Sequence, residues 1–344
     1  MLKRVLLAAK WLQSQWGWLK WVMAIALVIY LCEQNRDGFV RLTSRSLLPV
    51  SCGLALALAT ANVLLTFCRW YLLVRGLGFS FRLLDALRIG FLGCIFNLVG
   101  AGAAGGDVIR AMLIAKEQDS RRAVAMASVV LDRVIGLITL LMVGAAAACF
   151  QTTLIERSVE LKVLTAVLWS GSAAGVVGLL VLLHPAITRW SVMDRLGRMP
   201  IVGDSIHELI QGIVLYQQRR TVFAAAIGIG VLAHLCGLSS FYFCAEALQF
   251  GAAAPSFSGH LLLIPSAVIV EIVVPLPGGI GALEAAVQQC YVLANAASTT
   301  PVPPAQAAQA GFFTALLFRV LTLFIAAIGG VYYLATRRER HGLV

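Results

Sequence analysis

The chain has few charged residues for its length. Of its 344 residues, 12% are charged, whereas about a quarter are charged in an average soluble domain. Hydrophobic residues make up 60% of the chain, and several apolar runs reach the roughly 20 residues that cross a hydrocarbon core. The composition excludes a chain built around a soluble catalytic domain. It predicts one all-α integral membrane domain over residues 1–344.

The patterns that mark catalytic, metal and cofactor sites are also missing. The eight cysteines form no CxxC pair, and the five histidines show no metal-ligand spacing. There is no P-loop, no HExxH motif and no ordered Ser, His and Asp set. We therefore predict no enzymatic activity, no metal and no cofactor. The net charge of +11 is interpreted as basic residues on the cytoplasmic side of a membrane, without nucleic-acid binding.

Two apolar regions differ from ordinary spanning helices. Residues 84–115 and 257–293 are each interrupted near the middle by glycine or proline. Such breaks free backbone groups that lipid cannot satisfy, so they occur where they are buried in protein or line a wet cavity. We predict two re-entrant hairpins of broken helices, beside about six transmembrane helices at 18–32, 48–68, 123–149, 163–183, 221–248 and 308–334.

The distribution of Lys and Arg residues favours one orientation. With a cytoplasmic N-terminus and six crossings, cytoplasmic segments hold 20 of these residues and outer loops hold five. The remaining two, Arg133 and Arg319, lie within spans, which accounts for all 27. This bias follows the positive-inside rule and predicts that both termini are cytoplasmic. If either hairpin crossed completely, arginine-rich segments would be moved outside.

The cytoplasmic loop 184–220 contains a helical pattern. Its apolar residues recur at i, i+3, i+4, i+7 and i+8, which predicts an amphipathic helix on the inner leaflet. These residues are Ile206, Leu209, Ile210, Ile213 and Val214. A lid or anchor is the expected role, with a regulatory role as the alternative.

The order of elements occurs twice. Unit one, about 48–149, contains a span, a hairpin and a span, and unit two, about 221–334, has the same order. The single helix 163–183 links them, so the second unit starts from the opposite face of the membrane. An inverted-topology repeat with broken helices is the plan of many secondary transporters.

Arg133 and Arg319 occupy matching places in the two units, near the expected midplane. A charge there is costly, so each should face protein or water, with Asp132, Asp107, Glu271 and Glu284 as the expected partners. Two interpretations remain open. The arginines either form internal ion pairs that hold the hairpins, or they bind an anionic headgroup, because guanidinium suits phosphate.

Glycine and other polar residues mark the two breaks. Pro277, Gly278 and Gly279 in the second hairpin are followed by a new half-helix, whose free N–H groups favour an anion. Gly105 and Gly106 have the same place in the first hairpin. Close helix packing by small residues is the alternative. Four further polar residues surround the first hairpin: Asn97, Arg110, Asp85 and Arg88. The alternative for the two arginines is that their side chains extend to the inner membrane interface.

These same motifs resemble the flippase-like membrane domain of the lysylphosphatidylglycerol synthase family, which occurs in MprF-type proteins. Ala101 stands where many relatives have proline, so the bend is expected at Gly100 and Gly102. The resemblance implies lipid translocation without lipid aminoacylation, in the bacterial cytoplasmic (inner) membrane. It covers most of residues 10–336, and its matching stretches are Asn97 to Arg110, Ala127 to Leu137, and Pro277 to Glu284 followed by Arg319.

Three functions therefore remain as hypotheses. The first is translocation of a lipid with an anionic headgroup, such as a phospholipid, a modified lipid or a polyprenyl-linked glycolipid. The second is a scaffold for a lipid-biosynthetic or cell-envelope enzyme. The third is a membrane-embedded lipid-modifying enzyme. A transporter needs a cavity, open to lipid, that reaches Arg133 or Arg319, whereas a scaffold can be solid there.

Overall fold

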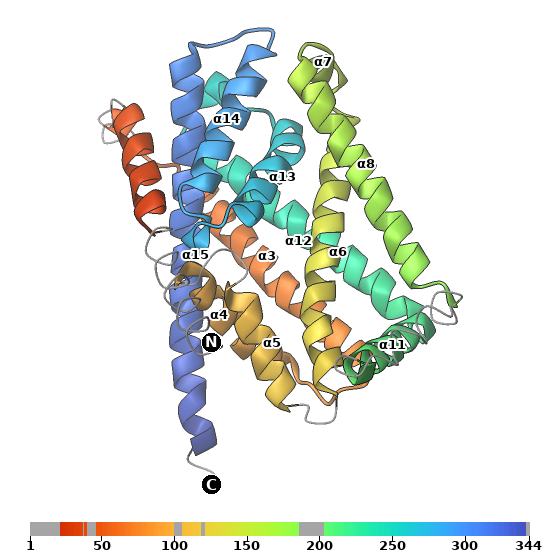
Figure 1. The fold of residues 1–344 in the computed structure, drawn as a ribbon. Coiled ribbons are helices and arrows are strands. Elements are labelled where there is room, and N and C mark those ends of the chain that lie inside the picture. The colour runs from red at the N-terminus through yellow and green to blue at the C-terminus, as the bar shows by residue number, and fades with distance from the viewer. Residues whose placement is uncertain are drawn as a thin grey trace, which may run out of the picture.

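A computed structural model describes residues 21–36, 38–39, 46–99, 105–117, 121–185 and 203–341 of the chain. Within these ranges the regular structure is helical (Figure 1). The first helix is Trp21–Gln34. The other elements are α3 (Pro49–Gly76), α4 (Leu83–Val99), α5 (Gly105–Glu117), α6 (Arg122–Ala148), α7 (Thr152–Glu156), α8 (Val159–Leu182), α11 (Gly203–Gln218), α12 (Arg220–Ala247), η1 (Gly251–Ala253), α13 (Phe257–Val273), η2 (Pro277–Gly279), α14 (Ala282–Ala296) and α15 (Pro304–His341).

The prediction of an all-α integral membrane protein is confirmed. Six helical segments of the described residues are long and apolar enough to cross a membrane, but their identity differs from the prediction in one respect. The segment predicted at 18–32 is a shorter apolar helix, Trp21–Gln34, in its described part, whereas Gly251–Val273 meets the criteria of length and composition. The apolar helix α13 and the short turn before it form a segment of 23 residues, Gly251–Val273. This arm of the second hairpin therefore has the length and composition of a transmembrane helix.

The centre of the fold is an antiparallel pair of long helices, α3 and α12. Leu48 N–H donates to the carbonyl of Ala247 at one end, and an Arg219 guanidinium N–H donates to the carbonyl of Arg75 at the other. Between them the Ser240 hydroxyl donates to Ala55 O over 2.8 Å. The two repeat units therefore meet along the first helix of each.

Glycines allow the other helices to approach closely. On α8, Gly175 faces Ile138 of α6, and on α15 a Cβ added at Gly329 would overlap the Phe91 ring of α4. Small residues permit such approaches between membrane helices, where packing and not the hydrophobic effect drives association. The predicted linking helix, now α8, packs on α6 through this glycine face.

The two hairpins enter from opposite ends of the molecule. In Figure 1, α4 and α5 occupy the lower half and α13 and α14 occupy the upper half, both beside α15. The tip of the first hairpin, residues 100–104, lies outside the described residues, as do the bends expected at Gly100 and Gly102. The tip of the second is the buried turn that contains η2. The arms α4 and α13 have 17 residues each and are shorter than α6 and α12, which have 27 and 28.

The predicted amphipathic helix in the loop 184–220 is present as α11. It lies at the end of the molecule where α3 and α5 end and α6 and α12 begin (Figure 1). The Tyr216 hydroxyl holds it to α3 by donating to Leu73 O over 2.8 Å. Basic residues gather at this end of the helices, among them Arg75, Arg82, Arg121, Arg122, Arg219 and Arg220.

Candidate functional site

The tip of the second hairpin is built around Arg319 of α15. Its Nε donates to Glu284 Oε1 over 2.8 Å, and its Nη1 donates to Glu271 Oε1 over 3.0 Å. Nη1 and Nη2 also donate to the carbonyls of Gly278 and Gly279, over 2.8 and 3.2 Å. The side chain is only 11% exposed. One guanidinium therefore joins α13, the η2 turn and α14 to α15.

The backbone at this tip requires glycine. Gly278, Gly279 and Gly281 have φ of 58°, 62° and 84°, a region that side chains with a Cβ rarely adopt. A Cβ added at Gly279 would also overlap Cγ of Glu271. These conformations turn the carbonyls of Gly278 and Gly279 toward Arg319. Pro277 starts the turn and is buried.

One N–H group at the start of this half-helix is occupied within the chain and is therefore not free for an anion. The N–H of Gly281, which precedes α14, donates to Glu284 Oε2 over 2.8 Å. The Glu284 carboxylate thus accepts the hydrogen bond that an external anion was expected to accept. The glycine turn offers carbonyl acceptors to a buried cation, which is the opposite polarity to the prediction.

The first unit has a buried cluster around Asp132 of α6. Arg69 Nε of α3 donates to Asp132 Oδ1 over 2.8 Å, and Arg110 Nη2 of α5 approaches Oδ2 at 3.5 Å. The Arg110 guanidinium also lies 4.3 Å from the centroid of the Trp70 ring, a favourable cation–π position. All three ionised side chains are almost fully buried. Arg110 therefore does not extend to the interface, and that alternative is wrong.

Arg133 has a different environment from Arg319. Its Nη2 donates to Asp107 Oδ1 of α5 over 2.8 Å, and Asp107 also contacts Arg110 Nη1 at 3.4 Å. The Arg133 side chain is 45% exposed. Asp132 and Arg133 are adjacent in sequence but point about 100° apart around α6, so one faces the buried cluster while the other faces outward.

The arms of the first hairpin touch through glycine. A Cβ added at Gly106 would overlap the backbone carbonyl of Gly93 on α4, and the Gly106 N–H donates to Asn97 Oδ1 over 2.7 Å. This N–H, like that of Gly281, is satisfied within the chain, so the predicted anion contact at Gly106 is wrong. Gly105 is the first residue of α5. Here the packing interpretation of the glycines holds.

A cavity of about 310 Å³ lies between the two hairpins. Arg133 of α6 and Asn97 of α4 line it from the first unit, and Glu271, Gly278 and Arg319 line it from the second. Asp107, Arg110, Asp132 and Glu284 are held behind this wall by their ion pairs. Among the described residues, Asp85 and Arg88, near the start of α4, do not line the cavity.

The cavity reaches the surface where α6 meets α13. Arg133 and Ile272 line it and are both about half exposed. The surface around them is apolar, with Val130, Val134 and Val273 exposed. In a membrane protein such a surface contacts acyl chains. A cavity with charged side chains in a largely apolar wall thus opens beside a lipid-facing surface.

The sequence interpretation missed four polar residues of this region. Arg69 was counted as cytoplasmic because the predicted span ended at residue 68, whereas α3 continues to Gly76. The apolar residues Tyr71 to Val74, which follow Arg69, indicate that the helix continues beyond residue 68. Asn62, His234 and Thr322 line the cavity, and each is an isolated polar residue in an apolar helix, which is by itself a pointer to a functional position.

Comparison with known proteins identifies one similarity. The model of the family described as lysylphosphatidylglycerol synthase TM region matches residues 6–330. Neither a curated protein nor a solved structure matches the chain.

Proposed function

The chain belongs to the family of the lysylphosphatidylglycerol synthase transmembrane region, and from this premise we propose that it translocates a lipid with an anionic headgroup between membrane leaflets. The family suggests a role connected with membrane lipids, and the chain is a multi-pass membrane protein. Translocation, without lipid chemistry by this chain, is the function that the cavity between the hairpins supports best.

The observation that carries the proposal is the half-exposed side chain of Arg133, which lines a cavity shared by both hairpins. The first cluster contains three arginines and two aspartates, Asp107 and Asp132, so its net charge is +1. The side of the cavity formed by this cluster is therefore net positive and favours an anion, and guanidinium binds phosphate through two parallel N–H groups. The phosphate of a lipid headgroup has the required charge and geometry.

The placement in the membrane follows from the same architecture. We place the basic end, with α11, in the cytoplasm of a bacterial inner membrane, so that both termini are cytoplasmic. The hairpin α4–α5 then enters from the cytoplasm and α13–α14 enters from outside. Arg133 lies eleven residues into α6 and Arg319 fifteen residues into α15, which places both about 17–22 Å from a helix end and near the midplane.

Translocation then proceeds with the two ends of the lipid in different surroundings. The headgroup enters beside Arg133, where the cavity is open, and passes between the hairpins. The acyl chains stay outside, against Val130, Val134 and Val273. This arrangement lowers the main barrier to lipid movement, because the phosphate is never transferred into hydrocarbon without a partner.

The scaffold alternative is less well supported by the cavity. A scaffold has no need of an opening between the hairpins, and close packing at Arg133 would serve it better. The cavity of about 310 Å³ that reaches both Arg133 and Arg319 is at the small end of the range of ligand sites.

The test is reconstitution of the full chain in liposomes that contain trace headgroup-labelled lipids. Labelled phosphatidylglycerol, phosphatidylethanolamine and phosphatidylcholine are compared, with and without a proton gradient, by the rate at which the inner-leaflet label becomes accessible to a quencher. We expect the anionic lipid to move faster in liposomes with protein than in empty ones. If none of the three moves faster under either condition, the scaffold replaces the transporter.

A further inference from the structure

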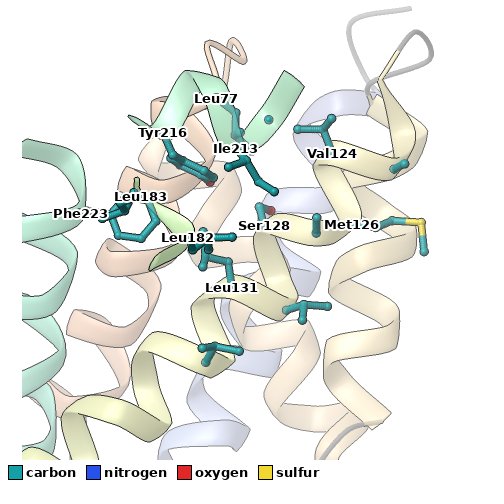
Figure 2. A pocket seen from close by; sticks show the side chains of 15 residues that line it. Leu77, Val124, Met126, Ser128, Leu131, Leu182, Leu183, Ile213, Tyr216 and Phe223 are labelled. Carbon is teal, nitrogen blue, oxygen red and sulfur yellow. The ribbon is translucent and has the colours of Figure 1, made fainter. Parts of the chain in front are cut away.

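A second, larger cavity lies at the basic end of the molecule, away from the hairpin tips. It has a volume of about 660 Å³ and is enclosed by α6, the end of α8, α11 and the beginning of α12. Figure 2 shows the apolar side chains that surround it, including Leu77, Val124, Leu131, Leu182, Ile213 and Phe223. The volume is within the range of sites that hold small organic ligands.

The walls of this cavity offer no unsatisfied polar side chain. The two lining residues with hydroxyl groups are Ser128 and Tyr216. Ser128 Oγ donates to Ala125 O over 2.6 Å, and Tyr216 OH donates to Leu73 O over 2.8 Å. Since both donors are occupied by the backbone, the cavity suits an apolar occupant and is a poor site for a polar solute.

One wall continues into the surface that faces lipid. Met126, Val130 and Val134 line the cavity at successive turns of α6, and all three are exposed. Val130 is the most exposed of them, at 65%. An acyl chain of the surrounding bilayer therefore has an apolar path along α6 into the cavity.

Two arginines lie near this cavity without lining it. Arg121 Nη1 donates to Leu77 O over 3.3 Å, and its guanidinium lies 5.1 Å from the centroid of the Phe79 ring. Arg219, three residues after Tyr216, donates to Arg75 O over 3.3 Å. A guanidinium has five N–H donors, and each of these bonds uses one. The charge near the cavity is complementary to a phosphate group.

We propose that this cavity binds one acyl chain of an anionic phospholipid, whose phosphate lies beside Arg121. Two observations select this occupant: the apolar cavity is continuous with the lipid-facing surface of α6, and two arginines lie near it. The site requires only a membrane around the protein and does not depend on translocation. Val134 lines this cavity, and Arg133, the residue before it in α6, lines the cavity between the hairpins. A lipid bound here is therefore close to the site proposed for translocation.

The test is photolabelling of the full chain in phosphatidylcholine nanodiscs. The probe is phosphatidylglycerol with a diazirine at the end of one acyl chain, and the labelled peptides are mapped by mass spectrometry. We expect labelling to concentrate on residues 123–134 and 212–223 and to be competed by unlabelled phosphatidylglycerol. Ala127→Phe fills the cavity and should lower this labelling about tenfold, which equals about 1.4 kcal/mol.

The matched control is Ala174→Phe, the same change at an exposed position of α8 outside the residues that line the cavity. It should leave the labelling unchanged. Ile213→Phe fills the cavity from α11 and provides a second reduction if Ala127→Phe fails to fold. Labelling spread evenly over exposed helices, or unaffected by both filling variants, overturns the site. If residues 186–202 and not a lipid fill the cavity, we likewise expect labelling that is spread evenly and unaffected by both filling variants.

The headgroup is tested separately. Arg121→Gln should reduce labelling by the phosphatidylglycerol probe about tenfold more than labelling by a phosphatidylcholine probe with the same chain, because the first has a net negative charge. Arg157→Gln, at the opposite end of the molecule, should affect neither probe. Equal losses for both probes would contradict a phosphate contact at Arg121. All of these readouts measure binding, so they remain informative if the liposome experiment finds no translocation.

Discussion

The tips of the two hairpins hold similar residues in opposite states. At the second tip, one arginine faces two glutamates and two carbonyls, so Arg319 is enclosed and the group has net charge −1. At the first tip, three arginines share two aspartates, and Arg133 extends into the cavity. One cluster is closed around its cation, and the other has a cation available to a ligand.

This difference assigns different tasks to two residues that look equivalent in sequence. Arg319 connects three segments of unit two, and its loss would leave Glu271 and Glu284 without their cation. Arg133 contributes one ion pair to Asp107 in a partly exposed site, where ion pairs add little to stability. We therefore expect Arg319 to determine folding of the second hairpin and Arg133 to determine lipid movement.

The largest effect is expected for Arg319→Ala. Removing one partner of a buried ion-pair group leaves uncompensated charges, which costs about 3–5 kcal/mol. The midpoint of thermal unfolding in detergent, followed by circular dichroism, should fall well below that of the wild type. Arg133→Ala is the matched control and should change the unfolding free energy by less than about 1 kcal/mol. Equal midpoints for the two variants would remove the distinction between the tips.

A smaller loss is expected for Gly279→Ala. Its positive φ costs about 1–3 kcal/mol for a residue with a Cβ, and the overlap with Glu271 adds to this. Gly228→Ala is the control, because Gly228 is in α12 and a Cβ there meets nothing within 4 Å. The control should stabilise slightly, since alanine favours helix. An unchanged midpoint for Gly279→Ala would show that the turn relaxes without strain.

Gly106→Ala should destabilise the protein less than Gly279→Ala does. The added methyl group overlaps the Gly93 carbonyl, and inserting a methyl into a packed contact costs about 1–3 kcal/mol. The backbone conformation itself is helical, so strain of the kind at Gly279 is missing. Gly53→Ala in α3, which meets nothing within 4 Å, is the control. Proteolysis of the α4–α5 connection gives a local readout, and equal rates in both variants would contradict the close contact.

Local features of the sequence were sufficient for the fold class and for much of unit two. The apolar runs predict the long helices, the periodicity of Ile206 to Val214 predicts α11, and breaks at glycine and proline predict where the chain reverses. Glu271 and Glu284 were among the four acids expected to pair with the two arginines, and in the structure both pair with Arg319. The hydrogen bonds from Arg319 to the carbonyls of Gly278 and Gly279 depend on the φ values of these glycines, which cannot be read from the sequence.

The first unit was harder to predict because its contacts join distant helices. Asp132 pairs with Arg69, 63 residues away, and not with the adjacent Arg133, since neighbours on a helix face different directions. The prediction also ended this helix at residue 68, whereas α3 continues to Gly76 and includes Arg69. The cavity walls contributed by Asn62 and His234 come from packing of α3 on α12, which no local pattern specifies.

Arg133→Gln, assayed for both lipid movement and stability, tests the assignment of tasks to the two tips most directly. The substitution keeps a polar side chain but removes the charge that faces the cavity. We expect translocation of labelled phosphatidylglycerol in liposomes to fall at least about tenfold, because a charge-assisted contact contributes about 1.5–3 kcal/mol. The unfolding midpoint should remain close to that of the wild type. Full translocation by this variant, or a loss explained by unfolding, would contradict the account.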